Sequence, residues 1–325
     1  MRKRNLFFLV AIFPFLTGWG HWGSPVKIGL ALDHTAGREI LVKKLREDLE
    51  DNRAELQIKD AQDNFSHQES QVRDLLSQGI QALILLPVTP SKSRGLVEAA
   101  HKVGIKVISL ERLVPSGGGD YLVAYDEAKG GTLQAKALAG SLPKGRYVLL
   151  EKDKGEEFHG GQIKALKSAV DRGDIQILRG HKASRNVAGA LRSILKPGSE
   201  KADALLAPDS SSTEEAFQAL EKATLKGKLL VAGVGEDLAA CRRIHEGTQI
   251  LTVYRSPLKL AAETAYLSAK VARKATTFDC QFVEMGEEGF KTKAVLLTPK
   301  IVDAKNLEST IIKDGLWKKE EVFEK

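Results

Sequence analysis

The sequence is poor in residues that build metal, redox and disulfide sites. Its 325 residues include 2 cysteines, Cys241 and Cys280, and 7 histidines. The cysteines form neither a C-x-x-C pair nor a metal-ligand spacing, and the histidines are scattered singly, without a His-x-x-x-His pair. We therefore expect no metal site and no cofactor. An exported chain could form a disulfide between the two cysteines, but the sequence leaves open whether they meet or stay as small buried thiols.

Motifs of several enzyme classes are missing as well. No G-x-S-x-G nucleophile elbow occurs. The first apolar run is followed by "DHTAGRE" rather than by the G-x-G-x-x-G of a dinucleotide-binding turn, and the nearest match, "GVGEDL" at 233–238, lacks the third glycine. We therefore expect that the protein is not an enzyme.

Neither sign of charge dominates the chain. The 49 basic and 42 acidic residues give a formal net charge of +7, and three of the basic residues, Arg2, Lys3 and Arg4, stand at the start. Without these three, 46 basic residues face 42 acidic ones, a balance of +4. No basic stripe is clustered along the sequence, so we expect no nucleic-acid partner.

Long hydrophobic runs are also absent after the first residues. The basic start is followed by an apolar run from Leu6 to Leu16 and then by glycines and Ser24, which is the order of an export signal. This run is too short to span a bilayer as a stable helix, which needs about 20 apolar residues. The sequence therefore predicts a signal peptide over residues 1–24 and an exported body that is soluble after the signal peptide is removed. An uncleaved anchor is the alternative.

Strand and helix patterns alternate along the rest of the chain. Buried-strand runs such as "VKIGLAL" from Val26 and "ALILLP" from Ala82 are separated by segments with apolar residues at helical spacing. This β-α-β succession predicts parallel sheets with helices on both sides. About 300 residues are enough for two hydrophobic cores. We therefore predict an α/β protein with two doubly wound parallel-sheet lobes.

Polar residues that follow the predicted strands are the candidates for a binding site. In doubly wound sheets, ligands lie outside the carboxyl ends of the strands. The residues at these places include Asp33, His34, Glu111, Arg112, Glu127, Asp209, Glu236 and Arg255.

Three passages resemble a known family across nearly the whole chain. They are "LQAKAL" at 133–138, "GTQILTVY" at 247–254 and "LLTPKIVDAKNLESTIIKDG" at 296–315. The sequence is similar to the ribose-type (type I) family of periplasmic sugar-binding proteins, and within it to the D-xylose-binding branch of ABC transporters. The resemblance implies two lobes joined by a three-strand hinge. We place the N-terminal lobe at 25–114 plus 256–293 and the C-terminal lobe at 115–255 plus 294–325, with the glycine-rich stretch 117–119 as the first crossing.

The resemblance also implies which residues bind the ligand. Glu111-Arg112 matches an Asp-Arg pair that grips sugar hydroxyls in this family, and Arg255 stands where the xylose-binding branch has a lysine. Arg38, in the loop after the first strand, corresponds to another family arginine. An expected stacking tryptophan in the second lobe is missing, so stacking is assigned to Phe65, Phe158 or His159.

Other positions depart from the family pattern. Glu127 replaces an asparagine, "PDS" with Asp209 replaces "SND", and Gly235 in "GVGED" replaces a ligand-binding aspartate. Replacing residues that bond to the sugar hydroxyls changes which sugar is bound. The ligand is therefore expected to be a xylose-like pentose or a related sugar, with an anionic sugar derivative left open. The resemblance implies a monomer that closes over its ligand and delivers it to the permease of an ABC importer. A periplasmic sugar-sensing receptor that docks to a sensor or chemoreceptor is the alternative.

Overall fold

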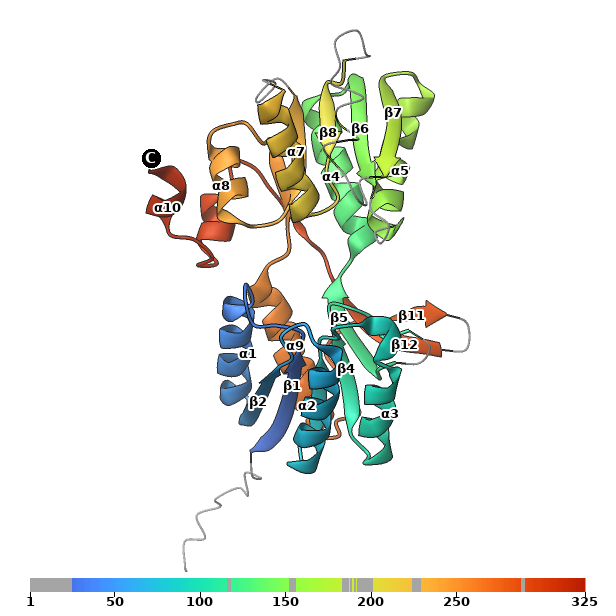
Figure 1. Ribbon diagram of the computed structural model, residues 1–325, viewed down its shortest axis with the longest axis vertical. Coiled ribbons are helices and arrows are strands. Elements are labelled where there is room, and N and C mark those ends of the chain that lie inside the picture. Colours follow the sequence, from blue (N-terminus) through green and yellow to red (C-terminus); the bar gives the residue numbers. More distant parts are fainter. Residues whose placement is uncertain are drawn as a thin grey trace, which may run out of the picture.

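The computed structural model describes residues 25–115, 118–151, 156–182, 201–223, 229–287 and 290–324, together with Val187, Gly189 and Leu191. The expected signal peptide, 1–24, lies outside the described residues. Two α/β lobes are joined by three crossing segments (Figure 1). The predicted fold class is therefore confirmed. Within the described residues no helix has both the length and the apolar character needed to span a membrane.

The N-terminal lobe is built on a seven-stranded sheet with the order β11-β12-β5-β4-β3-β1-β2, in which β11 alone is antiparallel to its neighbour. Its elements are β1 (Val26–Leu32), α1 (Glu39–Asp51), β2 (Ala54–Asp60), α2 (Phe65–Ser77), β3 (Ala82–Leu85), a short 3₁₀ turn (Pro90–Lys92), α3 (Arg94–Lys102), β4 (Lys106–Leu110), β5 (Tyr121–Tyr125), α9 (Pro257–Ala272), β11 (Val283–Glu287) and β12 (Phe290–Leu297).

The C-terminal lobe is built on a six-stranded sheet with the order β13-β10-β9-β8-β6-β7, in which the edge strand β13 is antiparallel. Its elements are α4 (Glu127–Ser141), β6 (Gly145–Glu151), α5 (Glu156–Asp171), β7 (Ile175–Lys182), β8 (Ala204–Leu206), α7 (Ser210–Lys222), β9 (Leu230–Val234), α8 (Leu238–His245), β10 (Leu251–Tyr254), β13 (Lys300–Val302), a π-helical turn (Glu308–Ile312) and α10 (Lys319–Phe323).

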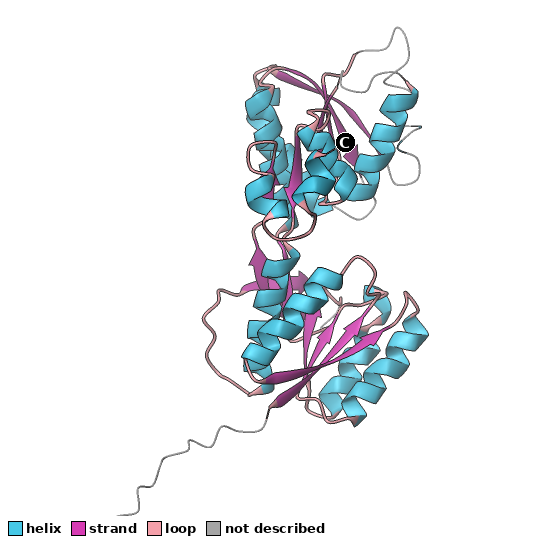
Figure 2. Cartoon of the chain, turned by 90° about the vertical axis from the view of Figure 1, so that its left-hand side faces the viewer, coloured by secondary structure: helices cyan, strands magenta, loops and turns pink. Residues whose placement is uncertain are grey.

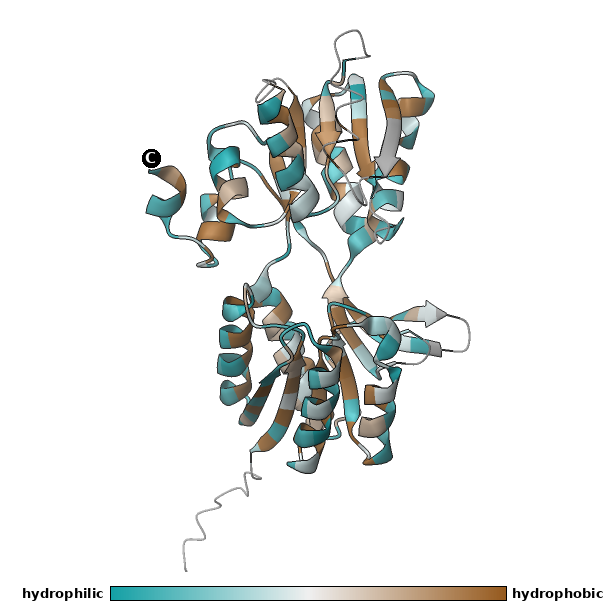
Figure 3. Ribbon diagram, viewed as in Figure 1, coloured by the Kyte–Doolittle hydropathy of each residue, from teal (hydrophilic) through white to brown (hydrophobic). Residues whose placement is uncertain are grey.

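Helices cover both faces of each sheet (Figure 2). In β3 every side chain is buried, and successive residues point to opposite faces: Ile84 packs with α1 and α9, whereas Leu83 and Leu85 pack with α2 and α3. Such unbroken apolar strands require cover on both sides. Figure 3 shows the result, with hydrophobic strands inside each lobe and hydrophilic residues on the outer faces of the helices.

The crossings between the lobes differ in place from the prediction. Tyr121–Tyr125 is a fully buried strand paired with both β4 and β12, so the first crossing comes after it, at Asp126, and not at 117–119. Gly118 and Gly119 belong to the loop between β4 and β5 of one sheet. The third crossing, expected near Lys293, comes after Leu297 because β12 runs on beside β5. The second crossing lies at Arg255, between β10 and α9.

The two cysteines lie in different lobes and are free thiols. Cys241 is buried in α8 of the C-terminal lobe, and Cys280 precedes β11 of the N-terminal lobe. The disulfide that the sequence left open is therefore not formed in this structure.

Candidate functional site

A hollow of about 840 Å³ lies between the lobes, and both lobes contribute to its wall. We call it the cleft. The described residues that line it are 37–41, Glu111, Arg112, Tyr125, Pro257 and Leu260 from the N-terminal lobe, Glu127, Phe158, 208–210, 234–237, Leu316 and Trp317 from the C-terminal lobe, and Arg255 at the second crossing.

The C-terminal wall of the cleft is formed where strands end and helices begin. Asp209, after β8, caps α7 by accepting a hydrogen bond from the Ser212 amide, and Asp237, after β9, caps α8 by accepting one from the Ala240 amide. Such caps satisfy amide groups that the first helical turn leaves unpaired. The polar residues that follow these strands therefore stabilise the helices as well as line the cleft.

On the N-terminal wall, two arginines share one buried carboxylate. Asp33 at the end of β1 is 1% exposed, and it accepts hydrogen bonds from Arg112 Nη2 and, at 3.4 Å, from Arg38 Nη2. Arg38 Nη1 also lies 3.0 Å from Glu111 Oε1, and Arg112 Nη1 donates to the Pro87 carbonyl at 2.9 Å. Burial opposes the charge of Arg38, but Glu111 and Asp33 outweigh it and raise the pKa of the guanidinium. Both guanidiniums are therefore held in place by several bonds.

Glu111 adopts an unusual backbone conformation beside this network. Its φ of 59° is in the left-handed region, which a non-glycine residue rarely occupies. The conformation lets the chain turn at the end of β4, with the Glu111 amide bonded to the Val123 carbonyl. The same turn brings Glu111 and Arg112 to the cleft wall. Such strained residues gather at binding sites because the surrounding structure holds them in place.

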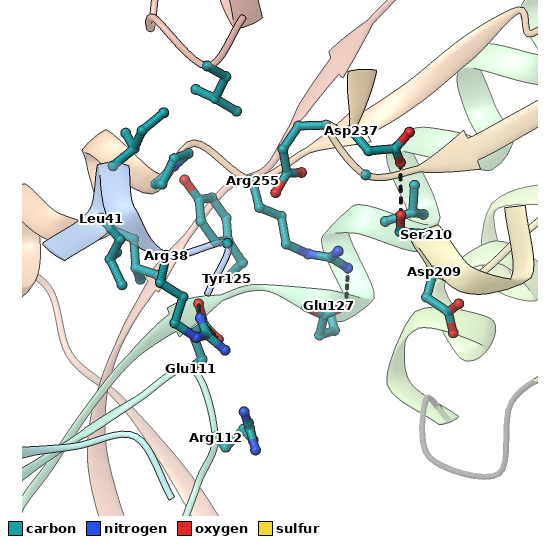
Figure 4. A pocket seen from close by; sticks show the side chains of 18 of the residues that line it. Arg38, Leu41, Glu111, Arg112, Tyr125, Glu127, Asp209, Ser210, Asp237 and Arg255 are labelled. Carbon is teal, nitrogen blue, oxygen red and sulfur yellow. Dashed lines mark hydrogen bonds and ion pairs between the residues drawn. The ribbon is translucent and has the colours of Figure 1, made fainter. Parts of the chain in front are cut away.

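Arg255 stands at the second crossing and faces Glu127 of the first. Its Nη2 donates to Glu127 Oε2 at 2.6 Å (Figure 4). The guanidinium also lies over the ring of Phe158, 5.9 Å from its centroid. Phe158 is fixed in turn by the close approach of α4 and α5, since a Cβ at Gly131 would fall 1.9 Å from the Phe158 carbonyl oxygen. This part of the wall is therefore rigid.

Glu236 has a perturbed ionisation. Burial raises the pKa of its carboxyl group to about 7, Asp237 and Glu111 add to this effect, and Arg255 opposes it. The carboxyl group can therefore act as a donor or an acceptor near neutral pH.

Trp317, in the tail after β13, is a lining residue that sequence reasoning missed. It is half-buried, and its indole N–H donates to the Glu236 carbonyl at 2.6 Å. Trp317 follows a helical turn and not a strand, so its place at the cleft is not visible from strand ends in the sequence. Leu316 beside it also lines the cleft.

The cleft brings together eight of the eleven predicted site residues: Arg38, Glu111, Arg112, Glu127, Phe158, Asp209, Glu236 and Arg255. The other three lie outside its lining. Asp33 lies behind it as the shared partner of two arginines, His34 turns to Asp63 with Nδ1 2.9 Å from Oδ1, and His159 lies 3.5 Å from Glu151. Phe65, the remaining stacking candidate, packs against the core beneath α2 and α3.

One cluster among the described residues could offer three metal ligands, namely Asp33, His34 and Asp63. Asp33 is already bound by two guanidinium groups. This competition makes the cluster a poor candidate for a cation site.

Comparison with known proteins adds to this geometry. Residues 30–276 match the model of a family described as periplasmic binding protein domain. The chain is 30% identical to the D-xylose-binding periplasmic protein of Escherichia coli (strain K12) over 348 aligned residues, which cover 99% of this chain and 100% of that protein. It is 29% identical to the ribose import binding protein RbsB of Bacillus subtilis (strain 168), with 75% of this chain and 84% of that protein covered.

A solved structure has the same fold. It is an ABC transporter solute-binding protein from Clostridium phytofermentans with bound β-D-glucose, at a TM-score of 0.77 and 21% identity, covering 91% of this chain and 99% of that one.

Proposed function

Because the chain belongs to the periplasmic binding protein family, we propose that it is the exported solute receptor of an ABC importer and that its ligand is a small uncharged carbohydrate. Its relatives are sugar-binding proteins rather than enzymes. The similarity to the D-xylose-binding protein supports a xylose-like pentose or a related sugar as the ligand.

The observation that carries the proposal is the pairing of every arginine among the described lining residues. Arg38 and Arg112 share Asp33, Arg38 also meets Glu111, and Arg255 meets Glu127. An anionic sugar would have to compete with these carboxylates for its counter-charge. Six acidic side chains against three guanidiniums also make the wall net acidic, even with Glu236 partly protonated near neutral pH. The charge therefore favours a neutral ligand over the anionic sugar derivative that the sequence left open.

Paired charges suit sugar hydroxyls. In each ion pair, the guanidinium has further N–H donors and the carboxylate further lone pairs. Neighbouring hydroxyls, each a donor and an acceptor, can therefore bond to both members of a pair. Glu111 with Arg38 presents such a set on the N-terminal wall, and Glu127 with Arg255 presents one at the crossings.

Closure of the lobes follows from the distribution of these groups. A ligand that bonds to both walls stabilises the closed arrangement by its greater affinity for that arrangement. The membrane permease then recognises the closed form. Docking to a sensor instead of a permease would use the same closed form, and no feature of the described residues favours it over import.

The proposal is tested by thermal shift and calorimetry with D-xylose and D-glucose against the sugar acids D-xylonate and D-glucuronate. We expect a neutral sugar to raise the melting temperature in a concentration-dependent way and the acids to have no effect. Arg112→Ala should weaken sugar binding at least about tenfold, because a buried bond from a charged donor is lost.

Arg172→Ala is the matched control, since Arg172 pairs with Asp174 on the surface of the C-terminal lobe outside the cleft. Tight binding of a sugar acid would contradict the charge argument. An unaltered sugar affinity of the folded Arg112→Ala variant would mean that Arg112 does not contribute to sugar binding.

A further inference from the structure

Three aromatic side chains line the cleft among the described residues: Tyr125, Phe158 and Trp317. Tyr125 is 7% exposed and its hydroxyl is bonded to the Ser256 carbonyl, and Phe158 is 2% exposed beneath Arg255. Trp317 is only half-buried. A sugar ring can stack only on an aromatic face that it can reach. Of these three rings, only that of Trp317 is accessible enough to offer such a face.

The ring of Trp317 is held in place rather than loosely attached. Its N–H is bonded to the Glu236 carbonyl at 2.6 Å. Around it, the tail packs into a core with α8 and α10 that includes Ile244, Ile311 and Val322. An aromatic side chain fixed by a bond at its polar end keeps its apolar face available, so little conformational entropy is lost when a ligand binds.

The tail that carries Trp317 also holds the second crossing. Asp314 Oδ2 accepts hydrogen bonds from Tyr254 Oη and from Ser256 Oγ, each at 2.6 Å. Asp314 and Trp317 are three residues apart in the chain. A ligand that contacts the indole therefore contacts the same tail segment that bonds to the second crossing.

We propose that Trp317 is the apolar wall against which the C–H face of the sugar packs, so that the C-terminal tail is part of the binding site. The inference rests on the proposed function. It gives the tail a specificity role: polar groups at the strand ends read the hydroxyls, and Trp317 selects for a ring with an uninterrupted C–H face.

The test uses the tryptophan itself. The other two tryptophans are Trp19 and Trp22, so the chain with Trp19→Phe and Trp22→Phe has Trp317 as its single tryptophan. With D-xylose and D-glucose as probes, its emission should change saturably, with the same Kd as calorimetry gives. Trp317→Leu should weaken binding at least about tenfold, since most of a buried apolar contact is lost, and Trp317→Phe, which keeps a ring, should weaken it less.

Phe282→Leu is the matched aromatic control, because Phe282 packs with Tyr121 and Phe278 outside the cleft, and its affinity should be unchanged. If circular dichroism shows that Trp317→Leu does not fold, the emission change of Trp317 and the sugar affinity of Trp317→Phe test the inference instead. Two results would overturn this inference and leave the proposed function intact. One is a Trp317 emission that does not change with a sugar that calorimetry shows to bind. The other is an unchanged sugar affinity of the folded Trp317→Leu and Trp317→Phe variants. Failure of the unaltered chain to bind any sugar would overturn the proposed function with it.

Discussion

Glu236 is the cleft residue whose charge depends most on pH near neutrality. Its carboxyl group has a pKa of about 7 instead of the ordinary 4.5, chiefly because it is buried. Between these two values the folded chain binds more protons than the unfolded chain. The free energy of unfolding must therefore fall as the pH rises through this range, and the loss is complete above about pH 7.

The Glu236→Gln variant should lack this dependence. Relative to the unaltered chain, its melting temperature should rise with pH between about 4.5 and 7 and stay level above, because the glutamine never ionises. Thermal melts of both proteins across this range measure the difference. Asp174→Asn provides a control, since Asp174 lies outside the cleft and its bonds to Arg172 and Lys144 lower its pKa. If the difference in melting temperature between Glu236→Gln and the unaltered chain does not change with pH, the fold does not raise the pKa of Glu236.

Gly235 shows why a family resemblance does not carry over to every position. The resemblance predicts a ligand-binding aspartate there, but the residue has a φ of 120°, which favours glycine. A Cβ would also fall 2.9 Å from the Cβ and Oγ of Ser210. The loop after β9 therefore leaves no room for a side chain at this position. Glu236, the next residue, provides the carboxyl group at this edge of the cleft.

Most polar residues that line the cleft could be predicted from the sequence because the rule that finds them is topological. Parallel strands bring their carboxyl ends to one edge, so Glu111, Arg112 and Arg255 could be placed without coordinates. The rule could not tell lining residues from the residue behind them: Asp33 ends β1 as expected but is buried under two arginines. It also could not find Trp317, whose position depends on how the tail folds back.

Among the elements, the second crossing is the most densely bonded. Ser256 caps α9 of the N-terminal lobe, its carbonyl accepts a bond from Tyr125 of β5, and its hydroxyl donates to Asp314 of the C-terminal tail. One residue thus connects a helix, a strand and the tail. The first and third crossings are joined as well, by a bond of 2.8 Å from the Asp126 amide to the Leu297 carbonyl. We therefore expect a rotation between the lobes to be concentrated at a few backbone positions.

Asp314→Ala should destabilise the fold by about 1–3 kcal/mol, because the variant leaves the hydroxyls of Tyr254 and Ser256 without their acceptor. Tyr254→Phe removes a donor together with its need for a partner and should cost less. Chemical denaturation of both variants measures the order of the two effects. Equal stability of Asp314→Ala and the unaltered chain would mean that the tail does not hold the crossing.

The helices and strands were predicted well where the apolar pattern is long and continuous, as in β1 and β3. The position of β5 shows the limit. Its five residues follow a glycine-rich loop that is typical of a linker, and the strand forms because β4 and β12 flank it, and β12 comes from more than 160 residues further along the chain. A pairing of that range is not visible in local sequence.

For the whole molecule, the arrangement of two lobes around one cleft predicts a change of shape on binding. Small-angle scattering should show a smaller radius of gyration when D-xylose or D-glucose saturates the chain, because contacts to both walls favour closure. Arg112→Ala at the same sugar concentration should keep the larger radius, since its binding is weaker. A radius that stays constant at full saturation would mean that the sugar binds without moving the lobes.

The two ends of the described chain belong to different lobes. Strand β1 starts at the outer end of the N-terminal lobe, and α10 packs on α8 in the C-terminal lobe (Figure 1). A donor fluorophore near one end and an acceptor near the other would therefore report a change in the separation of the lobes as a change in energy transfer. If a sugar closes the lobes as proposed, the labelled chain becomes a reagentless sugar sensor in which no residue of the cleft is altered.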